Sequence, residues 1–257
     1  MQLHFEKYGK GHPLIILHGL FGSLENWRTL SKVFSRSFQV FALDQRNHGH
    51  SPHSAEFTYP AMAEDLREFM EEQELPSAHL LGHSMGGKTA MLFALTYPEL
   101  VDKLIVVDIA PKAYARGHDD IFDALFSLHV ASIKSRHEAD TALAKKIPDL
   151  TLRQFLLKNL ERDDAGAFRW RIGLEEISQG YPDMIKALDW NHQQFSQPAL
   201  FIKGANSDYI KESDTPMIKA MFPQARIVAL PNAGHWAHAE KPQEFARIVL
   251  DFLIEED

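Results

Sequence analysis

Gly82-His83-Ser84-Met85-Gly86 is the stretch of this 257-residue chain that decides its fold. These residues spell G-x-S-x-G, directly after an apolar run at residues 78–81 and directly before a helical pattern over residues 88–97. A strand, a sharp turn and a helix form the context in which this pentapeptide makes a nucleophile elbow. Small residues flank the serine because the turn requires backbone dihedrals that a side chain resists. The stretch predicts a Ser84 hydroxyl at a helix N-terminus, where free N–H groups favour negative charge.

Strand-like and helix-like segments alternate on both sides of this stretch. Short apolar runs, typical of strands covered on both faces, lie at residues 14–17, 38–43, 78–81, 104–107, 199–202 and 227–230. Amphipathic patterns lie between them, at residues 24–34, 61–72, 88–97, 213–221 and 241–253. Such alternation predicts an α/β fold with a mostly parallel central sheet flanked by helices. A leading strand near residues 3–8 is expected at the sheet edge.

Residues 112–190 interrupt the alternation. They carry almost no strand signal, and helical patterns occur instead at residues 119–130, 135–146, 152–160 and 181–188. We interpret this segment as a helical cap, or lid, inserted into an α/β core made of residues 1–111 and 191–257. The cap is expected over the C-terminal ends of the strands. An independent second domain is the alternative, but the return of strand signals at residue 199 without a clear linker favours the cap.

Composition and charge narrow the classes of function. The formal net charge is −8 and no block of basic residues occurs, so a nucleic-acid partner is not expected. The absence of cysteine excludes disulfides, thiolate metal sites and a cysteine nucleophile. The first residues lack the features of a signal peptide, and no apolar run approaches the roughly 18 residues of a membrane helix. We therefore expect a cytoplasmic protein without a membrane span, and the oligomeric state stays open.

A serine hydroxyl becomes a nucleophile only with a base, an acid that orients the base, and donors for the oxyanion. The candidate base is His235, on the loop between the last apolar strand and the final helix. The candidate oxyanion donors are the backbone N–H groups of Leu20 and Met85, because the first follows the first central strand and the second follows the serine. His235 and His238 could share a metal, but no third ligand lies in register, so no metal is expected.

The acid is the hardest residue to assign. Asp108 ends the strand at residues 104–107, and Asp208 follows the strand at residues 199–202. Either one satisfies the chain order serine, aspartate, histidine that the elbow motif predicts. The position of the residues along the chain therefore leaves both aspartates open.

Over essentially its full length, the chain resembles the α/β-hydrolase-fold serine esterases. The likeness is closest to the small YbfF-type bacterial esterases and their mitochondrial relatives, and its motifs lie at residues 18–23, 44–51, 82–88, 107–111 and 234–242. The resemblance implies that the acid is Asp108, with Asp208 kept as the alternative because it falls one residue after the usual slot of the wider family. That slot holds Ser207, which is expected to hydrogen-bond the pair of Asp108 and His235.

Two further residues are expected in supporting roles, Arg46 through the same resemblance and His83 through its position in the elbow. Arg46 is expected to hydrogen-bond loop backbones near the site. His83 lies inside the elbow but is expected to point away from Ser84. Neither residue is expected to take part in the reaction itself.

The expected function is a serine hydrolase that cleaves carboxylic esters or thioesters with an apolar acyl group through an acyl-enzyme, without a cofactor. Family likeness adds acyl-CoA as a possible small-molecule substrate. Basic residues of the cap could meet an anionic group, although a solvated helix face is the favoured reading of Lys112, Arg116, Lys134 and Arg136. The alternatives are a carbon–carbon bond hydrolase, a lactonase or a perhydrolase with the same residues, or a non-catalytic ligand-binding protein of the same fold.

Overall fold

The computed structural model describes residues 1–255, so the last two residues of the expected core segment 191–257 lie outside the described residues. A seven-stranded sheet with the order β1-β3-β2-β4-β5-β8-β9 forms its centre. β1 lies at one edge and pairs antiparallel with β3, whereas the other pairs are parallel. The strands are β1 (Phe5–Tyr8), β2 (Pro13–Leu17), β3 (Gln39–Leu43), β4 (Ala78–His83), β5 (Val101–Val107), β8 (Ala199–Gly204) and β9 (Ala225–Leu230).

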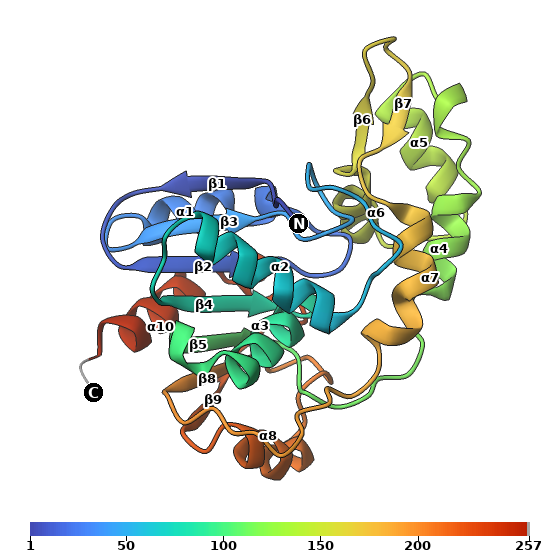
Figure 1. The fold of residues 1–257 in the computed structure, drawn as a ribbon. Helices are drawn as coiled ribbons and strands as arrows, with labels where there is room; N and C mark the ends of the chain where they lie inside the picture. The colour runs from blue at the N-terminus through green and yellow to red at the C-terminus, as the bar shows by residue number, and fades with distance from the viewer. Residues whose placement is uncertain (256–257) are drawn as a thin grey trace.

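Helices cover both faces of this sheet. α2 and α3 lie on one face, and α1 and α10 lie on the other (Figure 1). The mostly parallel sheet and its flanking helices confirm the expected fold class. The helices of this part are η1 (Leu24–Trp27), α1 (Arg28–Phe34), α2 (Tyr59–Glu72), α3 (Met85–Thr96), η2 (Pro98–Leu100), η4 (Glu212–Asp214), α8 (Thr215–Met221), α9 (Ala237–Glu240) and α10 (Pro242–Ile254).

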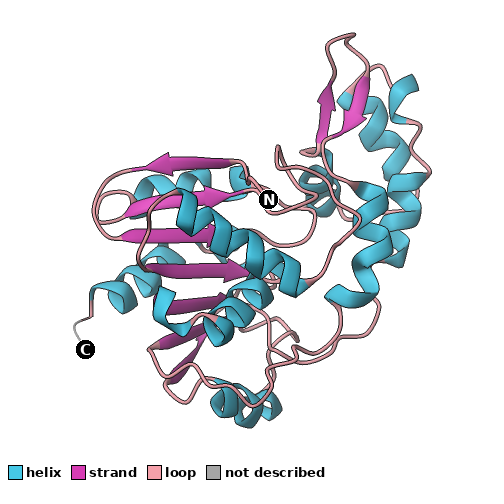
Figure 2. Cartoon of the chain, in the orientation of Figure 1, coloured by secondary structure: helices cyan, strands magenta, loops and turns pink. Residues whose placement is uncertain are grey.

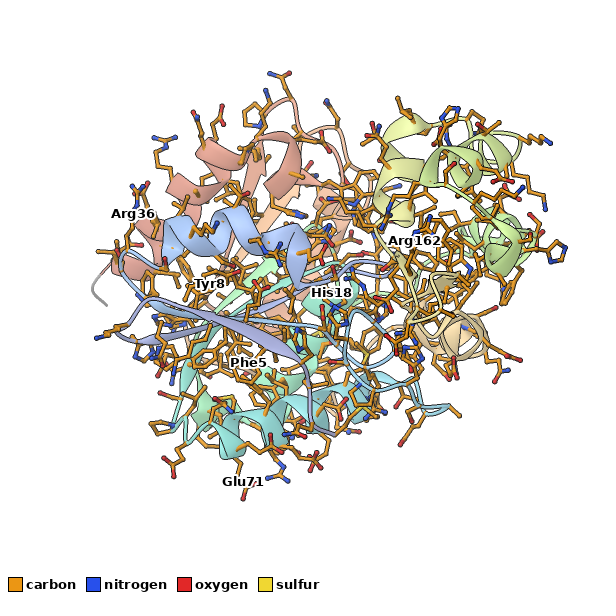
Figure 3. The ribbon with its side chains drawn as sticks, turned by 90° about the horizontal axis from the view of Figure 1, so that it is seen from above. Phe5, Tyr8, His18, Arg36, Glu71 and Arg162 are labelled. Carbon is orange, nitrogen blue, oxygen red and sulfur yellow. The ribbon has the colours of Figure 1, made fainter. Side chains whose placement is uncertain are left out.

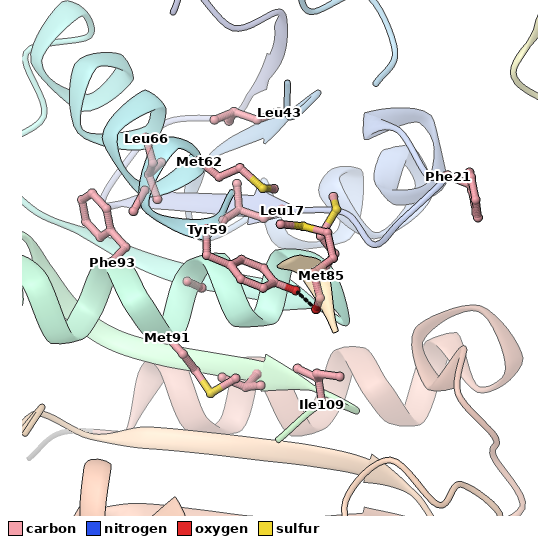
Figure 4. Close-up of a cluster of buried hydrophobic side chains, with 14 of the residues drawn as sticks. Leu17, Phe21, Leu43, Tyr59, Met62, Leu66, Met85, Met91, Phe93 and Ile109 are labelled. Atoms are coloured by element: carbon pink, nitrogen blue, oxygen red, sulfur yellow. Dashed lines mark hydrogen bonds between the residues drawn. The ribbon is translucent and has the colours of Figure 1, made fainter. Parts of the chain in front are cut away.

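Two apolar layers hold the sheet between its helices. Leu17 and Leu43 pack with Leu66 of α2 and Phe93 of α3 on one face (Figure 4). Neighbouring strand residues such as Ile16 belong to the opposite layer, which α1 and α10 complete. Successive strand side chains point to opposite faces, and both faces are covered, so the middle positions of these strands are apolar. This is why a short apolar run marks the middle of each central strand in the sequence.

The chain between β5 and β8, here called the insertion, is mostly helical (Figure 2). Two of its features correct the sequence reading. Residues 160–170 hold a short antiparallel hairpin where almost no strand was expected, and α7 begins well before residue 181 and ends before residue 188. Strands of three residues are too short to show a period of two. The elements are α4 (Asp119–Phe126), η3 (Val130–Ser132), α5 (Arg136–Leu143), α6 (Leu150–Leu157), β6 (Leu160–Arg162), β7 (Phe168–Trp170) and α7 (Leu174–Met184).

The insertion lies beyond the C-terminal ends of the parallel strands (Figure 1). Seen from above, it forms a lobe beside the core, and His18, just after β2, lies on the side of the core that faces it (Figure 3). Several hydrogen bonds join the insertion to the core, and two of them lie near its C-terminal end. The buried Lys88 amine donates to the Lys186 carbonyl at 2.5 Å, and the Tyr59 hydroxyl donates to the Met184 carbonyl at 2.9 Å. These bonds fix the end of the insertion against α2 and α3.

Candidate active site

Ser84 occupies a strained turn between β4 and α3. Its backbone has φ +52° and ψ −116°, a conformation that is rare for a residue with a side chain. The turn is held because the Ser84 N–H donates to the Val107 carbonyl at 3.0 Å. A Cβ atom on Gly82 would lie 2.2 Å from the Gly86 carbonyl oxygen, and one on Gly86 would lie 2.5 Å from that of Leu17. The G-x-S-x-G spacing therefore reflects the close crossing of strand and helix.

A fully buried aspartate orients His235. Nδ1 of His235 lies 2.8 Å from Oδ2 of the buried Asp108 and donates to that oxygen. The Gly204 N–H donates to the other carboxylate oxygen at 3.1 Å, and the Ser207 hydroxyl donates to Oδ2. Tyr209 stacks on the imidazole with ring centroids 3.9 Å apart. Because Nδ1 carries the hydrogen, Nε2 of His235 is left as the basic nitrogen.

The structure brings Asp108, and not Asp208, to the histidine. Asp208 is exposed, and within residues 1–255 its carboxylate makes no hydrogen bond to His235. Asp108 follows β5, which lies next to β4 and its elbow, and it has φ +51°. Spacing along the chain could not separate Asp108 from Asp208. The strand order explains the observed contact, because β4 and β5 are neighbours and their ends place Asp108 beside the loop of Ser84.

The loop after β2 lies against the elbow. A Cβ atom on Gly19 would lie 3.3 Å from the Ser84 Cβ atom and 2.8 Å from Nδ1 of His83, so only glycine allows this approach. Within the described part of the chain, the N–H groups of Leu20 and Met85 have no protein acceptor. Two unsatisfied N–H groups close to a serine are the donors that an oxyanion requires.

Residues that the sequence analysis missed hold this loop in place. Phe21 has φ +60°, its N–H donates to Nε2 of His48 at 3.1 Å, and its carbonyl accepts from Nδ2 of Asn159 at 2.7 Å. Asn159 is buried and follows α6 of the insertion. The segment at residues 44–51 marked the region of His48, whereas no local signal could indicate that Asn159 bonds a residue 138 positions earlier.

A cavity of about 560 Å³ opens between the core and the insertion. Ser84 and His235 line it together with α6 and the loop that bears Trp236. The lining mixes polar side chains with apolar ones, and the apolar ones include Leu20, Phe21, Ile121, Leu152, Phe155 and Trp236. Among the described residues that line the cavity, Lys158 is the only lysine or arginine. Lys112 and Arg116 instead pair with Asp214 and Asp119 and do not line the cavity.

Comparison with known proteins supports the same interpretation. Residues 12–242 match the family model described as the alpha/beta hydrolase fold. The chain belongs to the α/β-hydrolase family. It is similar to the esterase YbfF of Escherichia coli, with 36% identity over 94% of this chain and 92% of that protein. It is 41% identical to the mouse sn-1-specific diacylglycerol lipase ABHD11, over 93% of this chain and 80% of the relative.

A solved structure extends this likeness to three dimensions. A marine microorganism esterase superposes with a TM-score of 0.95 and 44% identity, covering 98% of this α/β-hydrolase and 99% of the other chain. The resemblance to YbfF-type esterases that the motifs indicated is thus confirmed. Since the named relatives are esterases and lipases, a hydrolase is supported.

Three buried histidines support the loops of this α/β-hydrolase without being charged. Desolvation lowers the pKa of His18 to about 4, and that of His48 and His238 to about 3. As neutral rings they can accept: Nε2 of His18 accepts from the Gln45 N–H at 3.0 Å. His238 stacks on Trp27 with ring centroids 4.3 Å apart.

The two remaining supporting residues, His83 and Arg46, form hydrogen bonds with groups other than the serine hydroxyl. Nε2 of His83 donates to the His235 carbonyl at 2.9 Å, and burial lowers the His83 pKa well below its usual value. Arg46 bonds both oxygens of Asp65, at 2.6 and 2.8 Å, and also donates to the carbonyls of Glu56 and Ala61. Arg46 therefore ties its loop to α2.

No helix within residues 1–255 is long and apolar enough to span a membrane.

Proposed function

We propose that this chain is a serine hydrolase of carboxylic esters and thioesters that forms an acyl-enzyme on Ser84. The observation that carries the proposal is the 2.8 Å bond from Nδ1 of His235 to a buried Asp108, at the edge of the cavity that Ser84 also lines. This bond supports the ring orientation and tautomer in which Nε2 is available for the serine proton. The strained elbow supports the role of Ser84, because such backbone strain clusters at functional sites.

Each step of the proposed reaction uses a group of this chain. Nε2 of His235 takes the hydroxyl proton as Oγ of Ser84 attacks the carbonyl carbon. The N–H groups of Leu20 and Met85 hold the oxyanion of the tetrahedral intermediate. His235 then returns the proton to the leaving alcohol or thiol, and the carbon–oxygen or carbon–sulfur bond breaks. Water, deprotonated by the same nitrogen, releases the carboxylic acid and restores the serine.

The insertion supplies the substrate pocket in this proposal. We propose that residues 112–190 act as a cap on a core of residues 1–111 and 191–257. The apolar side chains of Ile121, Leu152 and Phe155 favour an apolar acyl chain. Lys158 is the residue of the lining that suits an anionic leaving group such as coenzyme A. A cytoplasmic location stays a prediction from the sequence, which cell fractionation would test.

Labelling with a fluorophosphonate probe tests the proposed nucleophile. We expect the wild-type chain to be labelled at Ser84, and Ser84→Ala to lose both the label and the hydrolysis of p-nitrophenyl esters. Ser207→Ala is the matched control, because Ser207 is a serine of the same site that is predicted to support Asp108 and not to attack. Labelling that persists in Ser84→Ala, or a wild-type chain that is never labelled, contradicts the proposal.

A chain-length series addresses the substrate class. Esters and acyl-CoA thioesters of two to twelve carbons should show kcat/KM rising with acyl length until the cavity is filled, since each buried CH2 contributes about 0.8 kcal/mol. Lys158→Met should raise KM for acyl-CoA and leave uncharged esters unchanged. Equal effects on both substrate types would remove the thioester from the proposal and keep the ester.

A further inference from the structure

A second group of histidine and aspartate side chains lies at the opposite end of the sheet. His12 directly precedes β2, His79 lies in β4 and Asp102 lies in β5, and these three strands are neighbours. Leu14 pairs with His79, and Ala78 pairs with Val101, so the three side chains emerge where the parallel strands begin. The proposed catalytic residues lie where the strands end. The two groups are therefore separated by the length of the sheet.

The three residues have the spacing of metal ligands. One nitrogen of each imidazole and one oxygen of the carboxylate all lie within 4.8 Å of one another. Nε2 of His12 and Oδ2 of Asp102 are 2.8 Å apart, and the two imidazole centroids are 4.5 Å apart. Among residues 1–255, no other group of three histidine, cysteine, aspartate or glutamate side chains has its ligand atoms this close together. The ligand atoms thus need only small side-chain movements to surround one ion.

Burial divides the three ligands into a fixed one and two adjustable ones. The His79 side chain is only 7% exposed and packs edge-on against Phe38, with ring centroids 5.7 Å apart. The side chains of His12 and Asp102 are 43% and 38% exposed. A buried imidazole at the base and two partly exposed ligands at the surface allow an ion to enter from solvent. The ligands can close around it without a change in the strands.

We propose that His12, His79 and Asp102 form a binding site for a divalent transition-metal ion of the Zn²⁺ class. Two imidazole nitrogens and one carboxylate oxygen suit Zn²⁺, with water in the fourth tetrahedral position. The ligands lie in a surface cleft of about 380 Å³, which leaves room for that water. Glu99 lines the same cleft and adds negative charge near the ion.

A nearby lysine does not oppose the cation directly. Lys103 lines the cleft, but its amine donates to the carbonyl oxygens of Phe252 and Glu255, at 3.4 and 2.5 Å. Its ammonium group is therefore directed toward the C-terminal helix. The bound ion would join the starts of β2, β4 and β5, and its expected role is structural because the site lies far from the proposed nucleophile.

Titration calorimetry with ZnCl2 on the metal-stripped, untagged full chain tests the proposal, with Co²⁺ and its visible absorption as a second probe. We expect one equivalent of Zn²⁺ to bind and the Tm to rise with Zn²⁺ concentration. His12→Ala and Asp102→Asn should each weaken binding by more than the roughly 10- to 100-fold loss caused by removing a residue that only supports a ligand. Both side chains are partly exposed, so these variants should fold.

Matched controls separate this site from general binding to surface histidines. His137→Ala and Asp119→Asn change an exposed histidine and an exposed, ion-paired aspartate of the cap, and both should bind Zn²⁺ like the wild type. No binding, binding unchanged in His12→Ala and Asp102→Asn, or binding lost instead in His235→Ala would overturn the proposal. Because the readout is metal binding, the result is independent of whether Ser84 is a nucleophile.

Discussion

At both ends of the sheet, a histidine nitrogen lies 2.8 Å from an aspartate oxygen. At the C-terminal end Asp108 is fully buried and the His235 side chain is 19% exposed, whereas at the N-terminal end the exposed fractions are 38% for Asp102 and 43% for His12. A charge interaction is strong in a buried site and weak in water, where exposed pairs contribute about 0–1 kcal/mol. The distance between the partners therefore says less about function than their surroundings do.

The partners around each pair show the same difference. Asp108 is fixed by the Gly204 N–H and the Ser207 hydroxyl, and Tyr209 covers the ring of His235. A carboxylate held on several sides keeps its histidine in one tautomer and one orientation, as proton transfer requires. The side chains of the exposed pair, His12 and Asp102, are not enclosed in this way. Their hydrogen bond can therefore be replaced by a metal ion that both side chains bind.

The largest effect expected from this comparison is on turnover. Asp108→Asn should lower kcat by about 10⁴-fold, because an amide in place of the orienting carboxylate stabilises the wrong histidine tautomer. Asp102→Asn and Asp208→Asn should leave kcat unchanged. Steady-state kinetics with a p-nitrophenyl ester measure all three variants. A large loss in Asp208→Asn together with normal turnover in Asp108→Asn would transfer the role of acid to Asp208.

A smaller loss is expected where the insertion contacts the loop after β2. Asn159→Ala removes the donor to the Phe21 carbonyl, so the loop that carries the Leu20 N–H loses one of its two fixed points. We expect kcat to fall by up to about 100-fold, since a displacement of about 1 Å in a catalytic group has that cost. KM should change little, because Asn159 does not line the cavity.

Two variants sharpen the test on Asn159. Asn159→Asp keeps the size of the side chain but loses the amide donor, so its kcat should fall like that of Asn159→Ala. Gln193→Ala, at an exposed position, should behave like the wild type. Equal kcat values in all of these variants would show that the cap does not position the loop.

The parts of the molecule that sequence alone predicted are those where local pattern and tertiary structure agree. Residues 14–17 and 199–202 are buried on both faces of the sheet, so burial appears directly as an apolar run. The elbow was predictable because backbone strain and the close crossing at Gly82 and Gly86 require glycine. Both signals arise within a few residues of the feature that they specify.

The parts that sequence did not predict depend on contacts between distant residues. Residue spacing left open the choice between Asp108 and Asp208, which only the family resemblance directed to Asp108, because this choice depends on which strand end lies beside β4. The bond from Asn159 to Phe21 spans 138 positions, and the group of His12, His79 and Asp102 forms only after three strands align. The hairpin of β6 and β7 in the insertion was missed because its strands are too short to show a periodicity.

The buried histidines make stability depend on pH. His18 has a folded pKa of about 4, and His48 and His238 of about 3, against about 6.5 in the unfolded chain. Between pH 6.5 and 4 the unfolded state binds more protons, so the free energy of unfolding falls as pH is lowered. Each histidine contributes about 1.4 kcal/mol per pH unit over this window. Urea denaturation at pH 7, 6 and 5 measures the slope.

A pair of variants at the stacked rings tests this origin. His238→Phe keeps a ring against Trp27 but removes a titrating group, so the slope should become shallower. Trp27→Phe lowers stability through lost packing and should keep the slope of the wild type. A slope that His238→Phe leaves unchanged would show that the acid sensitivity lies in other groups.

The smallest expected effect is that of the exposed pair without metal. In a double-mutant cycle of His12→Ala and Asp102→Asn, measured by urea denaturation in the presence of a chelator, the coupling energy should be about 0.2–1 kcal/mol, as for other exposed ion pairs. Saturating Zn²⁺ should increase that coupling, because either variant then removes a ligand from the same ion. A large coupling with chelator would mean that His12 and Asp102 behave as a buried pair, and the contrast between the two ends of the sheet would disappear. A small coupling that Zn²⁺ leaves unchanged would keep the contrast and reduce the exposed pair to an ordinary surface contact.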